Sequence, residues 1–166
     1  MDFDLRRSSL IELRDALRRR RISPVELMEL VLARIAATGS SLNAVVSVRD
    51  RDALLADARA AGERIAHGEA RPLEGVPLGV KDLEDVAGLV TSQGSVPFRG
   101  NVATRDSTQV SRLRSAGVIV VCKTNTPEFG FTAVTKGSTE PTSAAAEPPL
   151  DPPGVRSRFQ GERVTP

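Results

Sequence analysis

The sequence predicts an α/β fold, and three observations lead to that expectation. Apolar residues recur at helical spacing through the first third of the chain. Residues 76–80 alternate as a strand does, and the apolar run at 118–121 is typical of a strand inside a parallel sheet. A helix-like segment lies between these two strands, so together they form a β-crossover-α-β unit with a right-handed connection.

Two helices are expected at the start of the chain. Ser9 has capping-box spacing to Glu12 and precedes a stripe of leucines at 10, 13 and 17. Ser23 is followed by proline at the first helical position and by Glu26, which closes a second box. A Thr-Gly pair at 38–39 is expected to end the second helix.

A strand at 44–48 and a third helix from about Asp50 are expected next. The apolar side of this helix is formed by residues 54, 58, 61 and 65, and His67 with Gly68 ends it. His67 is the only histidine, and its place at a helix end indicates a solvated residue rather than a catalytic one.

The third part of the pattern begins at Pro72 and has the order strand, loop, helix, strand. The loop at 82–105 is rich in Gly, Ser and Thr, and Asp106 or Ser107 is expected to cap the helix that follows. Functional residues of open α/β sheets gather at the carboxyl ends of the strands. Lys81 and Lys123 both fall there.

Composition indicates a soluble, cytoplasmic protein without a nucleic-acid or membrane partner. Of 166 residues, 40% are hydrophobic and 27% charged, with a formal net charge of +2. The single Cys122 favours a reducing compartment, and no apolar run approaches membrane-spanning length. The four arginines at 18–21 sit at a helix end, where positive charge complements the dipole, and no aromatic residue interleaves with them.

Lys81 stands out within its strand. Val76, Leu78 and Val80 would share one face, while Lys81 ends the opposite face behind only a proline and a glycine. From spacing alone, the lysine could simply extend from the strand end into solvent. The alternative is a catalytic amine, for which the two small neighbours leave room.

Three blocks carry a resemblance to a known family. They are 75–82 (Gly-Val-Pro-Leu-Gly-Val-Lys-Asp), 91–95 (Thr-Ser-Gln-Gly-Ser) and 112–130, which ends in Lys-Thr-Asn-Thr-Pro-Glu-Phe-Gly. In this order they are similar to the amidase signature family, and the resemblance covers roughly residues 8–136. It implies an α/β/α sandwich with a mixed sheet, of which this chain supplies the N-terminal helices and the first strands.

The resemblance also implies a chemistry. In this family a lysine acts through a second serine on a serine nucleophile that cleaves amides, without a histidine, a metal or another cofactor. Lys81 matches that lysine, and small-molecule amides would be the substrates. Burial would favour the neutral amine that a base needs.

Other matched positions are expected near the site. Thr91, Gly94 and Ser95 belong to a block that borders the active site, where they would contact substrate or shape a turn. Asn125 and Glu128 are expected to make structural hydrogen bonds and to cap a helix. Lys123 is a second candidate base but matches no catalytic position of the family.

The serines of the family are missing from these 166 residues. They lie in a glycine- and serine-rich stretch that also donates backbone N–H groups to the oxyanion, and nothing after Lys123 matches it. We therefore expect an amidase-type domain at 1–137 and a proline-rich, disordered tail at 138–166. The abrupt change suggests a frameshift or a truncated gene.

Three functions remain open at this point. The leading one is an N-terminal amidase fragment that is inactive alone because both serines are missing. The second is one half of a split amidase or amidotransferase that a complementing chain completes. The third is a non-enzymatic interaction module that uses the arginines at 18–21 or the tail.

Overall fold

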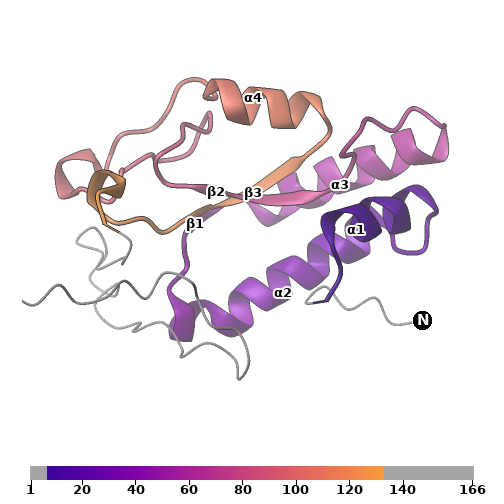
Figure 1. The fold of residues 1–166 in the computed structure, drawn as a ribbon, viewed down its shortest axis with the longest axis horizontal. Helices are drawn as coiled ribbons and strands as arrows, with labels where there is room; N and C mark the ends of the chain where they lie inside the picture. Colours follow the sequence, from indigo (N-terminus) through magenta and orange to yellow (C-terminus); the bar gives the residue numbers. More distant parts are fainter. Residues whose placement is uncertain (1–6, 133–166) are drawn as a thin grey trace, which may run out of the picture.

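The computed structural model describes residues 7–132, which fold into helices around a small sheet (Figure 1). The elements are α1 (Leu10–Arg18), α2 (Pro24–Leu42), β1 (Val45–Val48), α3 (Arg51–Ala66), β2 (Pro77–Lys81), α4 (Thr108–Ser115) and β3 (Ile119–Thr124). Two 3₁₀ helices, η1 (Val96–Phe98) and η2 (Glu128–Gly130), lie in the loops. The predicted tail at 138–166 lies outside the described residues.

The sheet is mixed and has three strands in the order β1-β3-β2. β3 lies in the middle, where it pairs in parallel with β2 and antiparallel with β1. The helix α4 covers one face, while α2 and α3 cover the other, so the described residues form three layers (Figure 1). This arrangement confirms the predicted α/β fold class and the β-crossover-α-β unit.

The two faces of the sheet bury separate apolar cores. On the α4 side, Val110 packs with Val80, Val86 and Val120. On the other side, the buried cluster consists of Met28, Leu54, Ala58, Ala61, Ile119, Val121 and Cys122. Because the chain has few aromatic residues, both cores are aliphatic, as the composition indicated.

The predicted helix starts are confirmed because capping is a local property. Ser9 and Ser23 each close a complete capping box, with Glu12 and Glu26 respectively. Ser107 caps α4, because its hydroxyl accepts from the N–H of Val110. The alternative cap, Asp106, instead accepts from the N–H of Ala87 in the long loop.

The predicted end of the second helix at Gly39 is wrong. Helix α2 continues to Leu42 and ends at Asn43, which adopts the left-handed conformation with φ of 45°. Its N–H donates to the carbonyl of Gly39, so the glycine stays helical. Asparagine tolerates left-handed geometry well enough to take the role that glycine usually fills.

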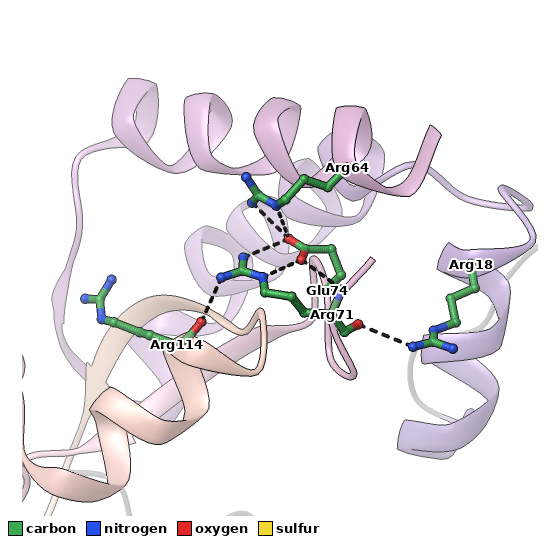
Figure 2. A network of polar contacts seen from close by, with 5 residues as sticks. All are labelled: Arg18, Arg64, Arg71, Glu74 and Arg114. Carbon is green, nitrogen blue, oxygen red and sulfur yellow. Dashed lines mark hydrogen bonds and ion pairs between the residues drawn. The ribbon is translucent and has the colours of Figure 1, made fainter. Parts of the chain in front are cut away.

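An ionic network joins the layers at the amino ends of β2 and β3 (Figure 2). The buried carboxylate of Glu74 accepts hydrogen bonds from the guanidinium groups of Arg64, on α3, and Arg71. Arg71 also donates to the carbonyl of Arg114 on α4, and Arg18 on α1 donates to the carbonyl of Arg71. One carboxylate thus holds together elements from both sides of the sheet.

Candidate functional site

The carboxyl ends of β2 and β3 lie side by side, as parallel pairing requires. Lys81 is paired with Thr124, and Val80 with Lys123. Val80 packs on the α4 side of the sheet, so the alternation of side chains directs Lys81 to the opposite face. The two lysines therefore end neighbouring strands but point in different directions.

Lys123 is fully buried, and its ammonium donates two hydrogen bonds and forms one ion pair. Its Nζ lies 2.7 Å from the carbonyl oxygen of Glu84, 2.9 Å from Thr91 Oγ1 and 3.1 Å from Asp82 Oδ1. These contacts hold the side chain inside the fold, so we interpret Lys123 as a structural residue rather than as the base.

Asp82 balances this buried charge and connects three segments. Its Oδ2 accepts from both the N–H and the hydroxyl of Ser92. Its backbone N–H donates to the carbonyl of Thr124, and its carbonyl accepts from the N–H of Gln93. Asp82 thus ties the end of β2 to β3 and to the turn at 91–95. We call Asp82, Thr91, Ser92 and Lys123 the tip cluster.

A bulge in β3 explains how Lys123 reaches this cluster. One step along β2, from Leu78 to Gly79, corresponds to two steps along β3, from Val120 to Cys122. An extra residue reverses the alternation beyond it. Val121 and Cys122 consequently both pack into the core on the α2 and α3 side, and Lys123 turns to the opposite side.

Lys81 is exposed, and its ammonium makes no hydrogen bond or ion pair with the described residues. Its main chain is nevertheless fixed by pairing with Thr124 and by the bond from the N–H of Glu84 to its carbonyl. Residues 7–132 do not bury its side chain as the catalytic hypothesis would require. A covering polypeptide would have to supply that burial, and the catalytic role of Lys81 stays a prediction.

Gly79 is required by close contact on the same face as Lys81. A Cβ at this position would lie 2.9 Å from Thr124 Cγ2 and 3.3 Å from Cys122 Sγ. The room that was expected beside Lys81 is therefore partly taken by β3. Burial also raises the pKa of the Cys122 thiol, which keeps it protonated and unreactive.

The three residues predicted to contact substrate, Thr91, Gly94 and Ser95, lie in the turn at 91–95 within the long loop that follows β2. Thr91 and Ser95 are buried, and the Thr91 hydroxyl accepts from Lys123 rather than facing Lys81. Gly94 has φ of 67°, and a Cβ there would lie 2.8 Å from the carbonyl oxygen of Thr126. These contacts give the turn a defined shape, while a role in substrate contact stays a prediction.

The two predicted structural residues differ in their surroundings. Asn125 donates from Nδ2 to the carbonyl of Asn43, which ends α2, and its Oδ1 accepts from the N–H of Thr126. Glu128 is exposed at the start of η2. Asn125 thus joins the end of β3 to the end of α2.

The tip cluster was not predicted from the sequence. Asp82 was given no role, and Lys123 was named only as a second candidate base. The sequence did contain a sign of this cluster. If a buried apolar strand extends to include a lysine, the lysine is buried as well and needs a carboxylate beside it. Asp82 directly follows the neighbouring strand and was the nearest carboxylate along that edge.

Comparison with known proteins decides the family. The family model described as Amidase matches residues 26–152, which is most of the chain. The chain belongs to the amidase signature family. The match ends inside the segment that was expected to be a tail, and the boundary at residue 137 stays a prediction.

Curated amidase relatives are much longer than this chain. A glutamyl-tRNA(Gln) amidotransferase subunit of Azoarcus sp. (strain BH72) is 46% identical over 124 residues, which are 75% of this chain and 25% of that protein. An acylamidase of Rhodococcus erythropolis is 41% identical over 111 residues, or 66% of this chain and 23% of the relative. The chain therefore spans about a quarter of their length.

Solved structures of amidase relatives agree with the fold. The native peptide amidase of Stenotrophomonas maltophilia matches with a TM-score of 0.67 and 31% identity, over 74% of this chain and 26% of that one. A vestigial protein complex, described as revealing the origins of an s-triazine catabolic enzyme, matches with a TM-score of 0.73 and 32% identity over 78% and 29%. Within residues 7–132, no helix is long and apolar enough to cross a membrane.

Proposed function

We propose that this chain is the lysine-bearing part of a cytoplasmic amide hydrolase and that Lys81 is the base of its reaction. The observation that carries the proposal is the contrast between the two lysines at the strand ends. The Lys123 ammonium contacts Glu84, Thr91 and Asp82 inside the fold, whereas the side chain of Lys81 makes no hydrogen bond or ion pair with the described residues. Only Lys81 is left to exchange a proton with a reacting group.

The family resemblance supplies the rest of the proposed mechanism. The neutral amine of Lys81 would accept a proton from a relay serine, which in turn takes the proton of the serine that attacks the amide carbon. The leaving amine would receive that proton on the return path. Neither serine is present in these 166 residues, so we propose that they do not hydrolyse amides on their own.

A second candidate is a split enzyme that a complementing polypeptide completes. Within the described residues, β1 and β2 each pair only with β3, which leaves two open sheet edges. Phe98, Phe129 and Phe131 form an exposed cluster in edge-to-face contact. Unpaired edges and an apolar patch are what remains where further strands and side chains belong.

A complementation assay tests the proposal. The chain would be produced together with the remainder of the Rhodococcus acylamidase, beginning where its matched segment ends, and p-nitroacetanilide cleavage would be followed by absorbance. We expect no cleavage by the chain alone and cleavage by the pair. Lys81→Ala should slow the pair about 100- to 10,000-fold, the usual contribution of a general base.

Arg59→Ala serves as the matched control, because Arg59 is an exposed cation on α3 and belongs to no part of the proposed site. Its pair should cleave the amide as fast as the unmodified pair. Equal rates for the Lys81→Ala pair and the Arg59→Ala pair would remove Lys81 from the mechanism.

A further inference from the structure

We propose that the ion pair between Asp82 and Lys123 is the positioning device of the candidate site. It holds the main chain of Lys81 and the turn at 91–95 in one fixed relation. Its catalytic consequence rests on the proposed function, but its structural consequence does not. Lys123 and Asp82 are positioning residues here, since their side-chain contacts lie on the α4 side of the sheet and Lys81 extends from the opposite side.

The first argument is the set of bonds that meet at Asp82. Its four polar groups are divided between two segments: its N–H and Oδ1 contact Thr124 and Lys123 of β3, and its carbonyl and Oδ2 contact the turn at 91–95. Asp82 follows Lys81 directly in the chain. A shift of Asp82 would therefore move the Cα of Lys81 as well.

The second argument is burial. Lys123 has 0% of its side chain exposed and Asp82 has 4%. Removing one partner of such a pair leaves the other charge without compensation in the interior, which is far more costly than losing an exposed pair. The pair therefore has one arrangement of low energy. Because Thr91 and Ser92 are hydrogen-bonded to the pair, the turn at 91–95 is held in place with it.

The third argument is the bulge in β3. A strand of regular alternation would direct position 123 toward α2 and α3, away from Asp82 and Thr91. The extra residue brings the ammonium to the side on which the turn lies. A local departure from regular pairing that delivers a charge to one spot is typical of bulges next to functional sites.

Hydrogen exchange of single amides tests the proposal without any need for turnover. Lys123→Met keeps the length of the side chain and removes its charge. We expect exchange to accelerate about 100-fold at the amides of Asp82, Ser92 and Gln93, all of which donate within or next to the tip cluster. Ile119, whose amide donates to the carbonyl of Val76 at the other end of the sheet, should keep its protection.

Two further variants separate positioning from general loss of stability. Lys81→Met is the control, because it removes an exposed lysine from the end of the neighbouring strand β2 and should leave all four amides unchanged. Asp82→Asn combined with Lys123→Met removes both charges and should restore part of the protection lost in the single variant. Ser92→Ala is a milder probe in case Lys123→Met does not fold.

The proposal is overturned by an equal acceleration at Ile119 and at the three tip amides, which would mean that the pair only adds to overall stability. No acceleration at the tip in either Lys123→Met or Ser92→Ala would overturn it too.

In the complemented enzyme, Lys123→Met should lower kcat about 100-fold with little change in KM. An inactive unmodified pair would count against the proposed function alone, since the exchange readout needs no catalysis.

Discussion

Lys123 Nζ lies 3.1 Å from Asp82 Oδ1, so the contact joins a residue of β3 to the residue that follows β2. The contact joins positions 41 residues apart in the sequence, as the difference between 123 and 82 shows. The two lysines at the strand ends therefore have different roles. Lys123 makes internal contacts that stabilise the fold, whereas the side chain of Lys81 makes no such contact with the described residues.

Asp82→Asn should lower the free energy of unfolding by about 3–5 kcal/mol, because it leaves the buried ammonium of Lys123 without a counter-charge. Urea unfolding followed by circular dichroism measures the loss. Asp85→Asn is the matched control, since Asp85 is an exposed carboxylate three residues further along. A loss of the same size in both variants would show that the ion pair contributes nothing special.

Glu74→Gln should have a pH-dependent cost. Burial alone would raise the pKa of Glu74, but hydrogen bonds from Arg71 and Arg64 outweigh it and hold the pKa below its usual 4.5. The folded-state pKa is the lower one, so the carboxylate stabilises the fold above pH 4.5 and loses this contribution as pH falls through the folded value.

We expect the variant to be about 2–3 kcal/mol less stable than the parent chain at pH 7, a value reduced for the partly exposed arginines. The gap should close as the pH falls below 4.5, as measured by urea unfolding at several pH values. Glu69→Gln, which changes an exposed glutamate, should show no such gap. A gap that stays constant down to strongly acid pH would contradict the assignment.

Gly117→Ala should be destabilising for two reasons that a control can separate. Gly117 has φ of 102°, and a Cβ there would lie 2.7 Å from the Cα of Glu74. Gly68 has φ of 77° but open space around it. Gly68→Ala should therefore cost about 1–2 kcal/mol of backbone strain. Gly117→Ala should cost about 1–3 kcal/mol more through the clash.

Phe131→Ser should raise the solubility of the isolated chain. Phe131 is 84% exposed and contacts Phe129 in the phenylalanine cluster, so its removal shrinks an apolar patch at little cost in stability. Light scattering against protein concentration measures the effect. Ile11→Ser, at a 63% exposed position on α1, should improve solubility less. An equal improvement would mean that the cluster has no special part in association.

The parts of the fold that the sequence predicted well depend on neighbouring residues. The caps at Ser9, Ser23 and Ser107 act over three positions, so their spacing is visible in the chain. The end of α2 was misjudged because Gly39 and Asn43 both can end a helix, and only the packing around them decides between the two.

The tip cluster was out of reach for the same kind of reason. Whether Lys123 faces the turn or the core depends on the bulge, and the bulge is a property of how β3 pairs with β2 rather than of β3 itself. The partner of Thr91 lies 32 residues away along the chain. The sequence indicated which residues lie at the strand ends, but not the face of the sheet to which each side chain points.

The extra residue in β3 also changes which positions of the strand face α4: even-numbered before it and odd-numbered after it. Val120, before the bulge, packs against α4, and Lys123, after the bulge, extends to the same side of the sheet, where it contacts Glu84. A deletion of one residue between them would remove the bulge and leave the lysine on the α4 side, but it would take away one of the two side chains, Val121 and Cys122, that pack against α2 and α3. Length, and not only composition, is therefore under constraint in this short stretch.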